Sequence, residues 1–142
     1  MNNSSTVCVD ANIVVRLVLF AEDKIQARWK RWESDEVQFV APSLLHYEVV
    51  NSLHQYQKGG QISAPTLERA LEAALGLPID LVDDNHIHRR AMVLAAQYGL
   101  PAAYDAHYLA LAEWMGIEFW TADKKLINTL KPFKFDWVKG IE

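Results

Sequence analysis

Four acidic side chains stand out by where they fall: Asp10, Glu48, Asp105 and Asp123. Asp10 and Asp123 each follow a short apolar run, whereas Glu48 and Asp105 lie in the first two turns of apolar helical patterns. Two carboxylates about 5 Å apart repel by roughly 3 kcal/mol at an effective dielectric of 20. A cluster of four therefore needs protons or cations. Because oxygen ligands suit Mg²⁺ or Mn²⁺ better than Zn²⁺, we expect a site for one of these ions.

Three of these acids also have a simpler explanation. Asp10, Asp105 and Asp123 each lie near a predicted helix start, where aspartate commonly caps the helix or interacts with its dipole. Glu48 lies too deep in its helix to be a cap, and it is flanked by Tyr47 and Val49 on a mostly apolar segment. Asp10, Asp105 and Asp123 can thus be either helix caps or metal ligands, whereas the position of Glu48 favours a metal ligand.

The five histidines do not form a pattern typical of zinc. His86 and His88 are two residues apart, so on a helix they point to different faces. His46 and His54 share a helix but are eight residues apart, and His107 follows the third acid. We therefore expect surface or partly buried histidines instead of a zinc site.

Short apolar strands alternate with amphipathic helices along the chain. The predicted strands cover residues 6–9, 37–41, 79–82 and 117–121, with a fifth edge strand at 135–138. The predicted helices cover residues 13–20, 23–34, 44–57, 63–75, 83–98, 104–115 and 122–130. Asp23, Ser43, Ser63 and Asp83 or Asp84 are the expected N-caps.

This alternation predicts an α/β fold, a three-layer α/β/α sandwich whose parallel sheet has four to five strands. In such folds ligands bind outside the carboxyl ends of the strands. All four acids are expected at that edge of the sheet, although they are spread from position 10 to position 123. The fold thus predicts one shared crevice for them.

Composition limits the alternatives. The 142 residues are 51% hydrophobic, which predicts a single domain over 1–142. The only cysteine, Cys8, lies in an apolar run and is expected in the core. Residues 1–6 lack the features of a signal peptide, and no apolar run reaches about 18 residues, so we expect a cytoplasmic protein without a membrane helix. The net charge of −4 disfavours non-specific adhesion to nucleic acid, but bound cations reverse the charge of the site.

Four segments in series resemble the signatures of PIN domains in order and spacing. They are VDANI at 9–13, PSLLHYEVVN at 42–51, YDAHYLALA at 104–112 and WTADKKL at 120–126. More narrowly, they look like the VapC-type toxin ribonucleases of bacterial and archaeal toxin–antitoxin pairs. The resemblance covers nearly the whole chain, and the series is far more specific than any of its members.

This resemblance implies a Mg²⁺- or Mn²⁺-dependent endoribonuclease that is the toxin of a type II toxin–antitoxin pair. It implies RNA as substrate, a small antitoxin protein as partner and a homodimer as assembly. The implied metal-binding and catalytic residues are Asp10, Glu48, Asp105 and Asp123, supported by Asn12 and Thr121. Arg16 and Lys124 lie near the same sheet edge and are candidates for binding RNA phosphates.

Two other functions remain open from the sequence. A non-catalytic PIN-like module would use the same fold to bind RNA or a protein partner. A phosphatase-like metal hydrolase would use a similar acidic edge on small phosphate esters.

Overall fold

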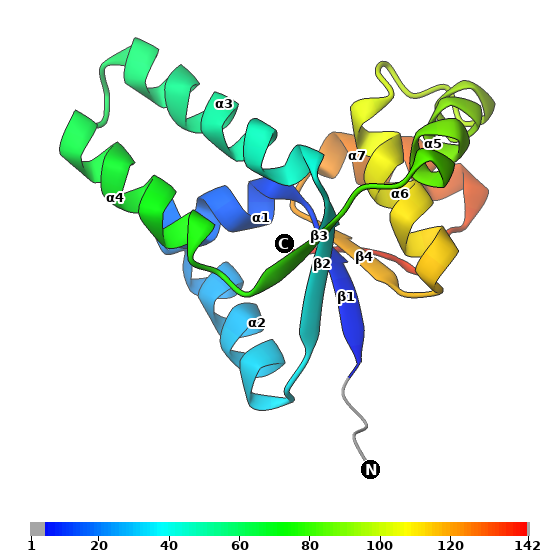
Figure 1. Ribbon diagram of the computed structural model, residues 1–142, viewed down its shortest axis with the longest axis horizontal. Coiled ribbons are helices and arrows are strands. Elements are labelled where there is room, and N and C mark those ends of the chain that lie inside the picture. Colours follow the sequence, from blue (N-terminus) through cyan, green and yellow to red (C-terminus); the bar gives the residue numbers. More distant parts are fainter. Residues whose placement is uncertain (1–4, 142) are drawn as a thin grey trace.

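A computed structural model describes residues 5–141 of the chain, so most of the segment for which we predict no signal peptide lies outside the described residues. Five parallel strands form one sheet in the order β3-β2-β1-β4-β5 (Figure 1). The strands are β1 Thr6–Val9, β2 Gln38–Pro42, β3 Ile79–Val82, β4 Glu118–Thr121 and β5 Val138–Gly140. The predicted parallel α/β architecture is confirmed.

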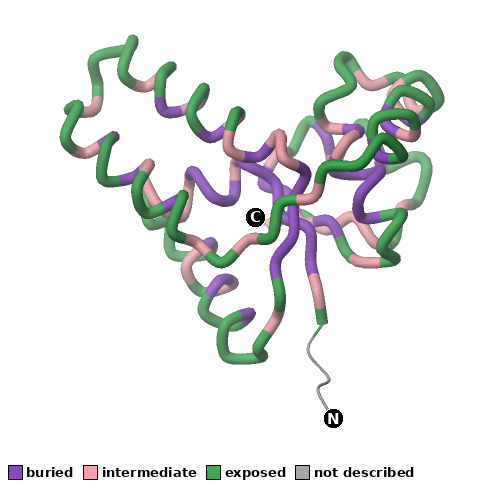
Figure 2. Tube along the Cα trace, in the orientation of Figure 1, coloured by how far each residue is buried: buried purple, intermediate pink, exposed green. Residues whose placement is uncertain are grey.

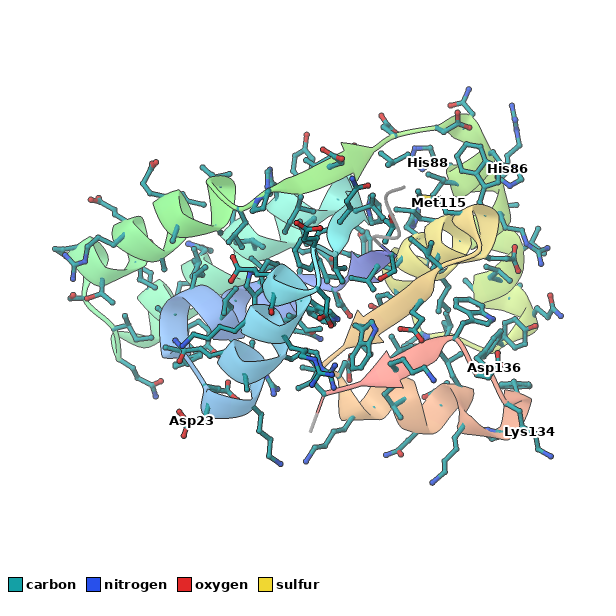
Figure 3. All side chains as sticks on the ribbon, turned by 90° about the horizontal axis from the view of Figure 1, so that it is seen from below. Asp23, His86, His88, Met115, Lys134 and Asp136 are labelled. Atoms are coloured by element: carbon teal, nitrogen blue, oxygen red, sulfur yellow. The ribbon has the colours of Figure 1, made fainter. Side chains whose placement is uncertain are left out.

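Helices cover both sides of this sheet. In Figure 1 helices α1 to α4 lie on one side of the strands and α5 to α7 on the other, and the view in Figure 3 agrees. The helices are α1 Ala11–Val15, α2 Asp23–Ser34, α3 Leu44–Gly59, α4 Ala64–Leu75, α5 Asn85–Gln97, α6 Tyr104–Met115 and α7 Lys124–Leu130. A π-helical segment, η1 Arg16–Phe20, follows α1, and a 3-10 turn, η2 Lys131–Phe133, follows α7.

The core runs along the central strands, where the trace is buried almost throughout (Figure 2). Cys8 is completely buried, as expected. Trp29 and Trp32 are buried as well, and the Trp29 ring stacks on Phe39 with centroids 4.3 Å apart. Both tryptophans of α2 therefore stabilise the core.

Several local predictions are wrong. The helix predicted at 13–20 begins two residues earlier, because Asp10 caps it, and continues as the π-helix η1. Asp23 is the first residue of α2 instead of its cap, and Ser43 has helical backbone angles that leave its side chain without a capping bond. The fifth strand pairs at Val138–Gly140, later than the predicted 135–138.

Other predicted helix caps and helix ends are confirmed. Ser63 accepts a hydrogen bond from the Thr66 N–H and caps α4, and Asp84 caps α5 through the His86 N–H. Gly60 and Gly116 end α3 and α6 with φ values of 69° and 67°, a left-handed conformation that glycine adopts without strain. Within residues 5–141, no helix is long and apolar enough to span a bilayer.

Candidate active site

The site begins where the order of the strands reverses. The chain runs outward from β1 to β2 and β3, then returns to place β4 on the other side of β1. At this switch point the Asp10 N–H donates to the Trp120 carbonyl at 3.0 Å, so the carboxyl ends of β1 and β4 lie side by side. Ligands of open α/β sheets bind at such a point.

Asp10 is held rigidly at this point. Its side chain is 5% exposed, and Oδ1 accepts a hydrogen bond from the Ala11 N–H at 2.8 Å, which caps α1. Oδ2 accepts from the Thr121 hydroxyl at 2.7 Å and from the Asn12 amide at 3.4 Å. The carboxylate is therefore fixed by donors from one strand, β4, and one helix, α1.

Thr121 and Asn12 join the first and fourth acids. The Thr121 Oγ1 accepts hydrogen bonds from the Asn12 amide at 3.3 Å and the Asp123 N–H at 3.0 Å. The Asn12 Oδ1 accepts from the Ala122 N–H at 3.0 Å. The two bonds made by Asn12 join residues over 100 positions apart, so they set the position of the β4 end relative to the β1 end.

Asp123 also caps a helix. Its Oδ1 accepts from the N–H groups of Lys125 and Leu126, at 2.9 and 3.2 Å, and starts α7. The capping explanation thus holds for Asp10 and Asp123. It does not hold for Asp105, which lies in the first turn of α6 with Ala103 at the cap position.

Glu48 projects from α3 toward α6. Its Oε1 accepts a hydrogen bond from the Tyr108 hydroxyl at 2.6 Å, and Tyr108 is completely buried. Tyr108 lies three residues after Asp105, which places both on one side of α6. Sequence reasoning missed this bond, because it depends on how α3 and α6 are placed, although an apolar helix with a tyrosine one turn after an acid is a usable signal.

The four acids act on one another electrostatically. Burial raises the pKa of Asp10 to about 7, Thr121 opposes this, and the charges of Asp105 and Glu48 raise it further. Burial, followed by the charges of Asp123 and Glu48, raises the pKa of Asp105 to about 6. Burial also raises the pKa of Glu48, while Tyr108 and His107 lower it. Asp105 is therefore coupled to the other three acids, and one acidic cluster is present.

The carboxylate oxygens of the cluster suit a divalent ion, but the side chains do not form a complete metal site as they stand. Its donors are carboxylate oxygens, and their mutual repulsion is the kind that a cation relieves. Among residues 5–141, no three His, Cys, Asp or Glu side chains converge closely enough to hold an ion as they stand. Side-chain rotation of the more exposed acids has to complete any such site.

The basic side chains that are candidates for binding RNA phosphates lie in different places. Lys124 lines a hollow of about 410 Å³ beside Asp123, together with Lys24 from α2. Arg16 forms an ion pair with Glu22, at 3.8 Å, and no contact joins it to the acids in the part of the chain described. Lys124 is thus placed beside the cluster, and Arg16 is not.

Three of the five histidines lie on α5 and α6, and the other two, His46 and His54, lie on α3. His86 packs on Trp114 with ring centroids 5.0 Å apart, whereas His88 Nδ1 lies 3.0 Å from His107 Nε2. Figure 3 shows His86 and His88 where β3 leads into α5. The pair formed by His88 and His107 was not predicted from the sequence, since it joins two helices.

Comparison with known families assigns the chain. The family model for the PIN domain matches residues 7–131. The chain belongs to the PIN-domain family. PIN domains are generally nucleases, and PIN nucleases generally use divalent metal ions. The predicted family resemblance is confirmed, and all four acids of this PIN domain lie within the matched range.

Solved structures share the fold of this PIN domain. A crystal structure from Pyrobaculum aerophilum is similar with a TM-score of 0.66 and 23% identity, covering 89% of this chain and 86% of that one. A toxin–antitoxin complex from Klebsiella pneumoniae gives a TM-score of 0.66 and 19% identity, with coverage of 93% and 94%. VapBC2 from Rickettsia felis, bound to a DNA fragment from its promoter, gives 0.66 and 14%, with coverage of 96% and 99%. No curated protein sequence matches the chain.

Proposed function

We propose that this PIN domain is a metal-dependent endoribonuclease that hydrolyses RNA phosphodiester bonds in the cytoplasm, with Asp10, Glu48, Asp105 and Asp123 as its catalytic and metal-binding residues. The observation that carries the proposal is the electrostatic coupling of these acids at the switch point of the sheet. A cluster that raises its own pKa values is costly to keep ionised, and such clusters are concentrated at functional sites.

Mg²⁺ or Mn²⁺ fits the oxygen-only donor set. When bound, such an ion supplies positive charge that stabilises attack on phosphorus and departure of the 3′ oxygen. Asp10, Glu48, Asp105 and Asp123 would hold it. The same charge lets an anionic RNA approach a chain whose net charge is −4.

The chain's own residues prepare the site. Thr121 and Asn12 orient Asp10 through the bonds described above, and Tyr108 orients Glu48. Lys124 and Lys24 line the hollow beside Asp123, where they attract phosphate groups of the strand being cleaved. Arg16 remains a weaker candidate, because its guanidinium already pairs with Glu22.

Incubating the purified protein with total cellular RNA tests the proposal. We expect cleavage that requires Mg²⁺ or Mn²⁺, is abolished by Asp10→Asn and is retained by Asp136→Asn, which changes an exposed acid in the loop before β5 (Figure 3). Cleavage by Asp10→Asn, or RNA binding without cleavage by the wild type, would overturn it. The second result would favour the non-catalytic module, and turnover of small phosphate esters alone would favour a phosphatase.

Metal binding is measured separately by thermal shift. Mn²⁺ should raise the melting temperature of the wild type, because a ligand that binds only the folded state stabilises it. Asp105→Asn should abolish the rise, since Asp105 is coupled to all three other acids. An equal rise in the wild type and Asp105→Asn would place the ion elsewhere.

We further propose that the chain is the toxin of a type II toxin–antitoxin pair and forms a homodimer. Two of the structures that share its fold are toxin–antitoxin complexes, which supports an antitoxin as partner. Induced expression should arrest growth in the wild type but not in Asp10→Asn, and light scattering of the purified protein measures its assembly. Normal growth on induction of an active, soluble wild type would refute the toxin role.

A further inference from the structure

A second hollow adjoins the acidic cluster on the side of β2 and β3. Its volume is about 320 Å³, at the low end of the roughly 300–1,000 Å³ of ligand pockets. The carboxyl ends of β2 and β3 contribute Pro42 and Val82, and four of the other eight lining residues carry rings: Tyr47, Tyr104, His88 and His107. Asp83 adds one carboxylate to the wall. This volume accommodates one small ring system.

Two tyrosines link this hollow, which we call the aromatic pocket, to the site. Tyr47 precedes Glu48 at the start of α3, and Tyr104 precedes Asp105 at the start of α6. Their side chains are 75% and 61% exposed, although tyrosine rings are usually buried more fully. Each ring therefore lies largely in solvent, one residue along the chain from an acid of the cluster.

The histidine wall of the pocket is fixed by a chain of hydrogen bonds. The His107 Nδ1 lies 2.7 Å from the Ala103 carbonyl, which only accepts, so this nitrogen carries a hydrogen. The His107 Nε2 and the His88 Nδ1 lie 3.0 Å apart and share a hydrogen bond, and the His88 Nε2 lies 3.1 Å from Asp83 Oδ1. Both rings are thereby held in one orientation, and all four of their nitrogens are engaged.

We propose that the aromatic pocket binds one nucleobase of single-stranded RNA, stacked on Tyr47 and Tyr104, while the phosphate next to it lies at the acidic cluster. The proposal rests on the ribonuclease activity proposed above and adds the base-binding subsite to it. Unpaired RNA bases are recognised by stacking on aromatic side chains and by hydrogen bonds along their edges. Ser43 and Asp83 in the pocket wall offer polar groups for that edge, and the hydrogen-bonded imidazoles of His88 and His107 hold the shape of the wall.

An RNA nucleotide is favoured over a protein side chain by position. His107 lies close enough to Glu48 to act on it electrostatically, so the pocket and the cluster are adjacent. A nucleotide joins a flat ring to a phosphate, which matches an aromatic hollow beside an acidic cluster that cations neutralise. The hollow of about 410 Å³ described above lies beside another of the four acids, Asp123, and with Lys24 and Lys124 in its wall it receives the continuing backbone.

Binding of short fluorescein-labelled single-stranded RNAs to Asp10→Asn protein tests the pocket without cleavage. In this background Tyr47→Leu and Tyr104→Leu should raise Kd by about 5- to 150-fold, as loss of base stacking does. Tyr104→Phe keeps the stacking face and should stay within about twofold. Tyr56→Leu is the control outside the pocket, because Tyr56 lies nine residues beyond Tyr47 on the same helix, about 13 Å along its axis. Its half-buried ring packs on Phe20, so a melting curve checks that this variant is folded.

The active protein supplies a second measurement. With the acids intact, sequencing of cleaved RNA ends should show that Tyr47→Leu and Tyr104→Leu change the base preference beside the cleaved bond. If wild-type protein cleaves RNA, but both leucine variants keep the Kd of Asp10→Asn and the base preference of the wild type, the pocket assignment is wrong. The proposed ribonuclease activity is then unaffected. If Asp10→Asn protein binds no RNA and the wild type cleaves none, both proposals fail. If the leucine variants weaken only binding of a partner protein, the pocket belongs to that partner instead.

Discussion

The charge cluster makes a specific prediction about stability in the absence of metal. The pKa of Asp10 is about 7 in the folded protein and 3.8 in an unfolded chain. The folded state therefore binds an extra proton between these pH values. The stability from this proton is fully present below the unfolded pKa and is lost as pH rises through the folded pKa. Metal-free protein should become less stable from weakly acidic to weakly basic pH.

The size of the effect follows from the pKa difference. Each pH unit between the two pKa values changes the free energy of unfolding by about 1.4 kcal/mol. Raising the pH from about 5.5 to about 8 should therefore cost about 2 kcal/mol through Asp10, or roughly 4–8 °C in melting temperature. Asp105, whose pKa is raised to about 6, changes stability in the same direction.

Asp10→Asn is the informative perturbation. It removes the cost of ionising Asp10, about 4 kcal/mol at pH 8, and gives up about 1–2 kcal/mol of charge-assisted hydrogen bonding from Thr121 and Ala11. We expect a variant that is more stable than wild type by about 2 kcal/mol at pH 8 and responds less to pH.

Thermal or urea unfolding in EDTA at several pH values measures this. Asp136→Asn is the control and should keep the wild-type dependence of stability on pH, since Asp136 is exposed in the loop before β5. A wild type whose stability is flat or rises over this range, or an Asp10→Asn variant that is folded but less stable at pH 8, would contradict the reasoning. Adding Mn²⁺ should restore the stability that wild type loses, and should not stabilise Asp10→Asn to the same extent.

Four further substitutions, at three positions, separate the roles of the site residues. Thr121→Val should lower the free energy of unfolding in urea by about 2–4 kcal/mol, because it leaves buried hydrogen-bonding groups around Asp10 without a partner. It should also raise the pKa of Asp10, because the hydrogen bond from Thr121 lowers that pKa. Tyr108→Phe should cost about 1 kcal/mol and raise the pKa of Glu48, and weaker Mn²⁺ binding by calorimetry would follow. Asp123→Asn should keep the α7 cap within about 0.5 kcal/mol, whereas Asp123→Ala should lose about 1 kcal/mol. Both should reduce the Mn²⁺ thermal shift equally if the charge of Asp123 binds the ion.

The parallel sheet and the edge that carries the acids could be predicted from the sequence. Short β-branched runs ended by Asp10 and Thr121, with helical patterns between them, allow few arrangements other than parallel strands with crossover helices. The placement of Asp10, Glu48, Asp105 and Asp123 at one edge followed from that topology.

Details that depend on tertiary contacts could not be predicted. Ser43 has the residue type of a cap but adopts helical angles at the end of β2, so its side chain caps nothing. The bond from Tyr108 to Glu48 and the pairing of His88 with His107 each join two helices, and no local pattern encodes the distance between them. The shift of the last strand to Val138 reflects pairing with β4, which propensity alone does not determine.

The burial of Asp10 has a consequence for the sequences of related chains. A carboxylate that destabilises the free fold is retained only while selection maintains the chemistry that requires it. Where a descendant has lost the proposed reaction, replacing Asp10 by a neutral residue should be among the earliest changes, because it relieves more repulsion and desolvation than changing a more exposed acid. An asparagine at this position, with Thr121 and Asn12 unchanged, would then mark a copy that has kept the architecture and lost the reaction.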